Sequence, residues 1–197
     1  MHIDYNMLNI GIMNGRLSPQ IDKKIQAFPL NSWKEEFRLA HECGFSVMEW
    51  VLDLSPNPIF DISGQNEIKA LTEKYNIKLN SICCDNFMER PLFGVSSYDL
   101  EINYKMLNKI IISCQKIGIK NIEIPLVDSS SIRKAKQKED FVKIIKRVMS
   151  PLQSDTNIIL ETDLPPKDFR DFLEVFESDR IKANYDVGNS ASLGFNL

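Results

Sequence analysis

Two carboxylates occupy matching positions in the last quarter of the sequence. Glu161 closes the predicted strand Asn157–Glu161, and Asp186 closes the predicted strand Ile181–Asp186. If these strands are parallel neighbours, their ends lie about 5 Å apart. Two carboxylates that converge repel each other unless a cation or a shared proton holds them. A divalent metal ion with oxygen ligands would satisfy both. Each carboxylate could instead cap the helix after its strand, and the spacing leaves that alternative open.

The alternation of side chains along a strand decides which way these groups point. In the strand that ends at Glu161, Ile158 and Leu160 should face the covering helices, so Ile159 and Glu161 should face the opposite, inner side. The same parity turns Glu123 inward, and we expect this carboxyl group to be paired rather than catalytic.

Short apolar runs alternate with amphipathic helical stretches along the whole chain. The predicted strands are Asn9–Met13, Ser46–Val51, Lys78–Cys84, Asn121–Val127, Asn157–Glu161 and Ile181–Asp186. Helices are predicted between them: from Asn31 or Ser32 to Gly44 with Glu35 in a capping box, then at about 65–75, 98–117 (ending at Gly118), 139–149 and 165–176. The predicted interior contains Met13, Val47, Ile82 and Ile159, and the helix residues predicted to pack on the strands are Trp33, Phe37, Leu107 and Ile111.

This alternation indicates an α/β fold with parallel strands. The segment after the first strand lacks the G-x-G-x-x-G pattern, which weakens the case for a dinucleotide-binding sheet. Polar residues cluster where strands end, as at the catalytic rim of a (β/α)₈ barrel. We therefore favour a TIM barrel with six strand–helix units, while an open doubly wound sheet stays as the alternative.

Seven segments, in the expected order, carry a resemblance: GIMNGRLSP, IQAFPLNSWKEEF, ECGFSVMEW, NSICCDNFMERPL, IPLVDSSS, LETDLPP and NYDVGNSASLGF. They resemble the xylose isomerase-like TIM barrels that include sugar-phosphate isomerases and epimerases. The resemblance implies one divalent cation, Mn²⁺ or Mg²⁺, held at the C-terminal rim. Two of the family's four ligands map onto Glu161 and Asp186.

The chain also departs from that family. Leu197 comes before any seventh or eighth strand, so the remaining ligands and the partner acid/base are absent from the sequence. We expect a single domain over 1–197, truncated after the sixth strand, in which the metal is weakly held. His2 and His41 are not at rim positions, and we expect neither to be a ligand.

The resemblance implies proton transfer next to a sugar carbonyl through an enediolate. Glu161 would be both metal ligand and catalytic base, and Asp186 a ligand only. The candidates for binding substrate hydroxyls or a phosphate are Asn14, Arg16, Glu49, Asp85, Asn86 and Asn189. An inosose dehydratase-like lyase, or an incomplete barrel that acts as a binding or assembly protein, remains an alternative. Without rim histidines or a basic surplus, an abasic-site endonuclease on the same fold is disfavoured.

The composition and charge of the chain limit the kinds of binding partner that we expect. The net charge is -3 and the sequence pI is about 5.5, which gives no electrostatic reason to expect a nucleic-acid partner. No apolar run approaches the ~20 residues of a membrane span, and the N-terminus shows no signal-peptide pattern. The cysteines lack metal-type spacing, and we interpret them as buried free thiols in a cytoplasmic protein. Because six strands leave two sheet edges, we expect a continuation past Leu197, a homo-oligomer that covers the gap, or aggregation.

Overall fold

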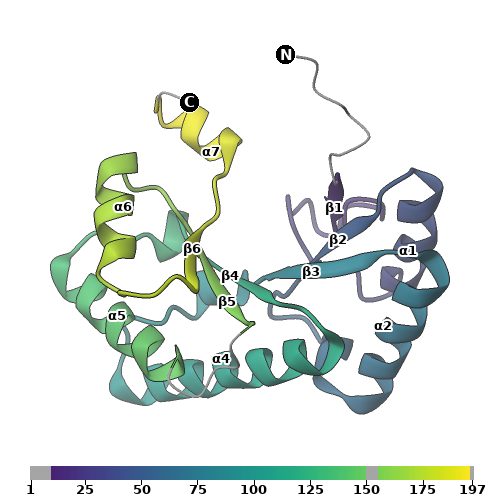
Figure 1. Ribbon diagram of the computed structural model, residues 1–197, viewed down its shortest axis with the longest axis horizontal. Coiled ribbons are helices and arrows are strands. Elements are labelled where there is room, and N and C mark those ends of the chain that lie inside the picture. Colours follow the sequence, from purple (N-terminus) through teal and green to yellow (C-terminus); the bar gives the residue numbers. More distant parts are fainter. Residues whose placement is uncertain (1–9, 150–154, 196–197) are drawn as a thin grey trace.

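The computed structural model describes residues 10–149 and 155–195, and in them six parallel strands form one sheet (Figure 1). The strands are β1 (Gly11–Met13), β2 (Val47–Val51), β3 (Lys78–Cys83), β4 (Asn121–Leu126), β5 (Asn157–Thr162) and β6 (Ile181–Ala183). They are ordered in the sheet as in the sequence. Each predicted strand is confirmed with shifted ends, except that Asn9 lies outside the described residues. A doubly wound sheet reverses its strand order at a switch point, so the sequential order excludes that alternative.

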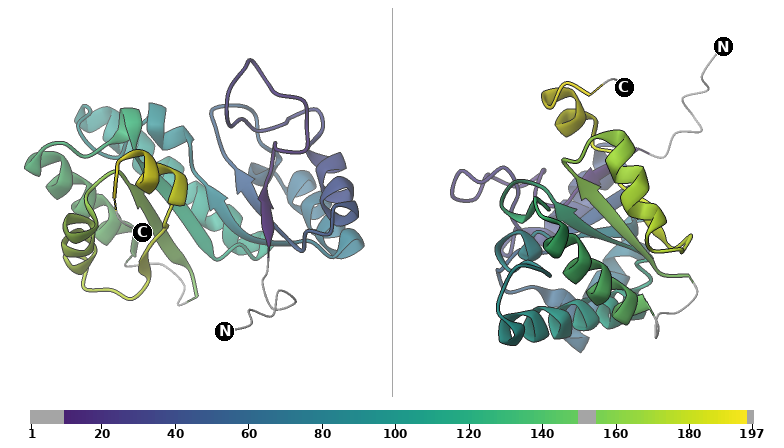
Figure 2. Two further views of the ribbon diagram at one scale, coloured as in Figure 1. Left: turned by 90° about the horizontal axis from the view of Figure 1, so that it is seen from above. Right: turned by 90° about the vertical axis from the view of Figure 1, so that its left-hand side faces the viewer.

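The helices between successive strands lie on the outside of the curved sheet, and one further helix follows the last described strand (Figures 1 and 2). They are α1 (Trp33–Glu42), α2 (Ile62–Tyr75), α3 (Asn86–Glu89), α4 (Ser97–Ile117), α5 (Ala135–Met149), α6 (Pro166–Glu174) and α7 (Val187–Ser192), with short 3-10 turns η2 (Pro58–Phe60) and η3 (Asp128–Ser130). The five predicted helices are confirmed. The short helices α3 and α7 were not predicted from the sequence pattern.

The outer face of the sheet packs against these helices as an apolar core. Trp50 of β2 is fully buried among Phe28, Trp33 and Phe37, with ring centroids 5.2–6.4 Å apart. A second aromatic group centres on Phe141, which lies 6.1–6.4 Å from the rings of Phe93, Phe172 and Phe176. The predicted helix contacts Trp33, Phe37, Leu107 and Ile111 are all buried, as expected.

The inner face is less covered than the sequence predicts. Of the four residues predicted in the interior, Met13, Val47 and Ile159 are only half-buried on this face, whereas Ile82, which pairs with Trp50, is fully buried on the outer face. Ile159 lies on the opposite face from the buried Ile158 and Leu160, as side-chain parity predicts. In the part of the chain that the structure describes, no helix layer covers this face, and β1 and β6 are the two edges of the sheet.

Two local expectations at α1 are wrong. Ser32 precedes the helix, but its side chain makes no capping hydrogen bond; its hydroxyl lies 2.7 Å from that of Ser18. Glu35 pairs with Arg38 one turn later instead of closing a capping box. Cys43, at the end of α1, is exposed, whereas the other three cysteines are buried free thiols. A solvent-facing position in the last turn explains this difference.

Candidate functional site

Three glutamates meet on the inner face, and we call them the inner carboxylate cluster: Glu49 of β2, Glu123 of β4 and Glu161 of β5. The register sets this meeting, because Glu49 pairs with Ser81 and Cys83 pairs with Glu123, while Glu161 lies level with Pro125 of β4. Parity turns all of them to the side away from the helices. Glu123 is buried, and the other two are half-buried.

Two asparagine amides hold Glu161. The Nδ2 of Asn189 in α7 donates to Glu161 Oε1 over 2.6 Å. The Nδ2 of Asn184, which follows β6, donates to Glu161 Oε2 over 3.2 Å and to Glu123 Oε1 over 3.0 Å. Hydrogen bonds donated to a carboxylate stabilise its ionised form and fix its orientation. Glu161 is therefore a positioned carboxylate at the end of a strand.

The ionisation of the cluster is uneven. Burial raises the pKa of Glu123 to about 10, and the hydrogen bond and negative charge of Glu161, with the charge of Glu49, act in the same direction. Burial also raises the pKa of Glu49, against the hydrogen bonds of Ser81 and Glu123 that lower it. At neutral pH Glu123 is thus protonated. A neutral, hydrogen-bonding carboxyl group beside Glu161 lets the carboxylates lie close together without a cation.

Asp186 lies at the start of α7, where it caps the helix. Its Oδ1 accepts the backbone N–H of Asn189 over 2.7 Å. Asn189 therefore joins the two predicted metal ligands, through its side chain to Glu161 and through its backbone to Asp186. The sequence left open that each carboxylate caps a helix. Asp186 does so, whereas Glu161 accepts hydrogen bonds from two asparagine side chains. Asp163, which precedes α6 in the sequence, accepts hydrogen bonds from Ser131 and Arg133, each over 2.6 Å.

These residues do not fit a complete divalent-metal site. In residues 10–149 and 155–195, no group of three or more His, Cys, Asp or Glu side chains is arranged to hold a metal ion. Both oxygens of Glu161 already accept amide hydrogen bonds, which an incoming ion would have to displace. Divalent ions of this kind take about six oxygen ligands, and this part of the chain does not bring such a set together.

The remaining predicted site residues divide into two groups. Asp85 lies toward the inner side: it accepts from Gln26 over 2.6 Å and from Cys83 over 3.2 Å, and burial raises its pKa. Asn14 and Arg16 instead fasten the loop after β1. Asn14 donates to Glu36 of α1 over 2.6 Å, and Arg16 donates to the carbonyl of Ile25 over 2.8 Å.

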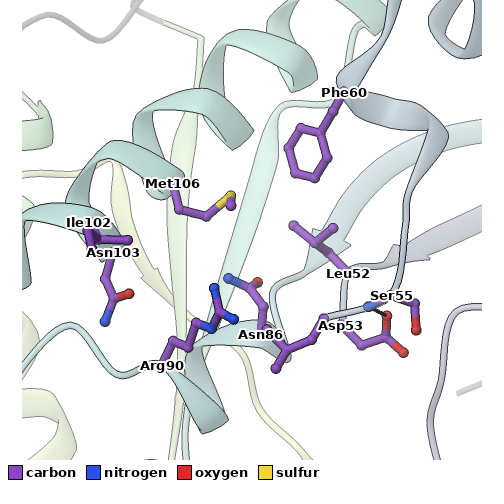
Figure 3. Close-up of a pocket in the computed structure, with 10 residues that line it drawn as sticks. Leu52, Asp53, Ser55, Phe60, Asn86, Arg90, Ile102, Asn103 and Met106 are labelled. Carbon is purple, nitrogen blue, oxygen red and sulfur yellow. Dashed lines mark hydrogen bonds between the residues drawn. The ribbon is translucent and has the colours of Figure 1, made fainter. Parts of the chain in front are cut away.

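Asn86 is separated from the other predicted site residues. Its side chain points into a pocket on the outer side of the sheet, lined by residues of the loop after β2 and of α4 (Figure 3). Leu52, on the same outer face, lines the same pocket. Asn86 therefore does not join the inner carboxylate cluster.

Asn184 is the contact that the sequence analysis missed. Lys182 of β6 pairs with the inward-facing Ile159 of β5, so the alternation of side chains also places Asn184, two positions later, on the inner side. That parity was the available signal. The role of Asn189 as the amide partner of Glu161, by contrast, depends on α7, which the sequence analysis did not foresee.

A search for helices able to cross a membrane found none in the part of the chain that is described. No protein-family model matches this sequence, and no curated protein matches it. Solved structures do match. A D-psicose 3-epimerase with D-tagatose from Clostridium cellulolyticum H10 aligns with a TM-score of 0.73 and 16% identity, over 92% of this chain and 64% of that one.

Two further structures extend the comparison. A xylose isomerase-like TIM barrel protein from Mycobacterium smegmatis in complex with magnesium has a TM-score of 0.65 and 14% identity, over 93% of this chain and 66% of that one. A family 2 AP endonuclease from Brucella melitensis has a TM-score of 0.59 and 11% identity, over 92% and 70%. This chain thus spans less than two thirds of the length of the epimerase. With six parallel strands in sequential order and helices outside them, the chain has the fold of the xylose isomerase-like TIM barrels, as an open rather than a closed sheet.

Proposed function

We propose that this protein acts as a sugar or sugar-phosphate isomerase/epimerase, with Glu161 as the residue that transfers the proton. The observation that carries the proposal is the environment of Glu161. This carboxylate lies on the inner face one residue before the end of β5, held by the amides of Asn184 and Asn189 beside the neutral Glu123. The neighbouring D-psicose 3-epimerase, whose structure contains D-tagatose, supports the reaction class.

In the proposed reaction, Glu161 takes a proton from the carbon next to the sugar carbonyl. The two amide donors hold the carboxylate pointed at one position, as a general base requires. An enediolate forms. Return of the proton by Glu161 to the neighbouring carbon gives an isomer, whereas an epimer requires a second acid, from outside the described residues, that protonates the original carbon on its other face. We propose Glu49 and Asp85 as partners for substrate hydroxyls on the same face. Asn14, Arg16 and Asn86 keep a substrate role only if their present partners or orientation change.

The proposal includes a divalent ion, Mn²⁺ or Mg²⁺, with Glu161 and Asp186 as the ligands from this chain. A bound ion would supply charge stabilisation for the enediolate. Since the described residues do not make a complete cage, we expect binding by this chain to be weak, and no step above is routed through the ion. The magnesium named for one structural neighbour supports this part of the proposal.

A solvent-exchange assay tests the function. The purified protein is incubated in D₂O with a panel of ketoses, aldoses and their phosphates, with and without Mn²⁺ or Mg²⁺. We expect deuterium to enter at the carbon next to the carbonyl of at least one sugar. Glu161→Gln keeps the shape of the side chain but removes the base and one of the two acceptors for the asparagine amides, so exchange should fall by about 100-fold or more. Glu139→Gln, at an exposed position on α5, is the matched control and should keep the parent rate.

The absence of a complete ligand set in the described residues favours a second candidate, a barrel that binds or assembles without catalysis. The same assay separates the two. Absence of exchange on every sugar and metal tested would reject the isomerase/epimerase proposal. Equal rates for Glu161→Gln and the parent would reject the role of Glu161.

A further inference from the structure

The loop between β1 and α1 crosses the C-terminal ends of β2 and β3. Figure 2 shows this loop beyond the C-terminal end of β1. The backbone N–H of Phe28 donates to Asp53, which follows β2, over 3.1 Å. The side-chain amide of Gln26 donates to Asp85, which follows β3, over 2.6 Å. Gln26 is therefore a loop residue that reaches the inner side of the sheet.

Contacts on both sides of Gln26 fix the backbone that carries it. Phe28 is 1% exposed, and its ring centroid lies 5.2 Å from that of Trp50 in the outer core. On the other side of Gln26, the guanidinium group of Arg16 donates to the carbonyl of Ile25 over 2.8 Å. Gln26 thus lies between two held points, so little conformational freedom is lost when its side chain makes a contact.

Asp85 is held at both of its carboxylate oxygens. The Nε2 of Gln26 donates to Oδ2, and the thiol of Cys83 donates to Oδ1 over 3.2 Å. Cys83 pairs with Glu123 of the inner carboxylate cluster, so the contact with Cys83 places Asp85 on the inner side. Each carboxylate oxygen has two lone pairs, so both oxygens can still accept a hydroxyl group. Asp85 is half-buried, and part of it remains accessible to a molecule.

The surroundings of Asp85 oppose its ionised form. Burial raises the pKa of this carboxyl group, and the negative charges of Asp53 and Glu161 act in the same direction. The hydrogen bonds from Cys83 and Gln26 lower this pKa, because each donor stabilises the carboxylate. Loss of the Gln26 amide would free one oxygen of Asp85 and favour the protonated form.

We propose that Gln26 is a positioning residue that keeps Asp85 turned toward the inner face, where Asp85 accepts a hydroxyl group of the bound sugar. This inference rests on the proposed function, because it assigns a task within that site. Asp85 follows β3 and Glu161 lies in β5, so one strand separates them and their backbones are about 10 Å apart. The hydroxyl that Asp85 binds should therefore lie farther along the sugar than the carbon that loses its proton.

Deuterium exchange with an accepted sugar tests this contact. Gln26→Leu should raise KM about tenfold and leave kcat within about twofold, because the lost hydrogen bond serves binding rather than proton transfer. Asp85→Ala should raise KM at least as much. The double variant should match Asp85→Ala, since Gln26 acts only through Asp85. Among monodeoxy analogues of the sugar, the one that lacks the bound hydroxyl should give equal KM values in the parent and Gln26→Leu.

Gln20→Leu is the matched control, since this amide belongs to the same loop but donates to the carbonyl of Lys24, over 3.0 Å, rather than to Asp85. It should keep the parent KM. The inference is overturned if Gln26→Leu keeps the parent KM or lowers kcat instead, if the two losses multiply in the double variant, or if Gln20→Leu gives the same loss. Gln26→Asn, whose amide is one methylene shorter, should behave like Gln26→Leu and decides if that variant does not fold.

A titration without sugar separates this inference from the proposed function. The pKa of Asp85 is followed through the carbon NMR resonance of its carboxyl group in the parent and in Gln26→Leu. We expect a higher pKa in Gln26→Leu, because a hydrogen bond that stabilises the carboxylate is lost. Equal pKa values would overturn the inference whatever the exchange assay shows. If the parent exchanges deuterium with no sugar, the proposed function fails, while a higher pKa in Gln26→Leu still supports the positioning of Asp85 by Gln26.

Discussion

The two faces of the sheet differ in how their side chains are stabilised. On the outer face, residues such as Trp50, Ile122 and Leu160 are fully buried against helices, and apolar packing accounts for their positions. On the inner face, Ile159 is half-buried, and its neighbours are the carboxyl groups of Glu123 and Glu161. The outer face therefore stabilises the fold. The inner face carries ionisable groups at a cost that their hydrogen bonds only partly offset.

This difference separates the roles of the faces. Burial of apolar surface stabilises the folded protein in proportion to the area removed from water. This stabilisation depends little on pH. A buried carboxyl cluster depends on protonation, as the raised pKa values of Glu49 and Glu123 show. Perturbed carboxyl groups gathered on one face are typical of functional sites. Three predictions sharpen this comparison.

The largest effect concerns adjacent residues of β5 that point to opposite faces. Leu160→Ala should lower the free energy of unfolding by about 2–5 kcal/mol, because it leaves a cavity in the outer core. Ile159→Ala should cost less than half as much, since Ile159 is already partly in contact with water. Urea unfolding of both variants measures the difference. Equal losses would mean that the faces contribute equally to stability.

The next effect is a pH dependence confined to the inner face. The unfolded chain releases the proton of Glu123 near the ordinary pKa of 4.5. The folded protein, in which this pKa is raised to about 10, keeps the proton to much higher pH. The contribution of Glu123 to stability is therefore complete below about pH 4.5 and declines as the pH rises toward 10. Glu123→Gln should remove this decline, which amounts to at most about 1.4 kcal/mol per pH unit.

Urea unfolding of the parent and Glu123→Gln between pH 5 and 9 measures that slope. Leu160→Ala is the control, since an outer-face cavity should lower the curve without changing its pH dependence. Parallel curves for the parent and Glu123→Gln would show that Glu123 is ionised in the folded protein.

The smallest effect is local to α7. Asp186→Ala removes the capping hydrogen bond to Asn189, which costs the helix about 1 kcal/mol. No residue of α7 is buried, so global unfolding should hardly change. Amide hydrogen exchange should become faster in Val187–Ser192 and stay unchanged in α6. Faster exchange throughout the sheet would show that α7 is coupled to the core.

The sequence predicts the outer face better than the inner one, for physical reasons. Period-2 and helical spacing are sufficient to place Leu107, Ile111 and Ile158 in the core, because burial against a neighbour needs only an apolar side chain on the correct face. The same parity correctly turns Glu123 and Glu161 inward. It does not identify their partners, which come from residues far away in the sequence, such as Asn184. Met13 and Val47 are half-exposed because none of the described helices covers them, and no local sequence pattern encodes that.

The open sheet described above has a consequence for how such barrels are built. Its curvature matches that of longer TIM barrel proteins closely enough to give a TM-score of 0.73, although β1 and β6 do not meet. Ring closure is therefore not what bends this sheet. Each strand–helix unit sets its own rotation relative to the preceding one, through the twist of the strands and the width of the helix layer. A barrel of this kind is modular, because each described unit keeps its place in the sheet without contact between the first and the sixth strand.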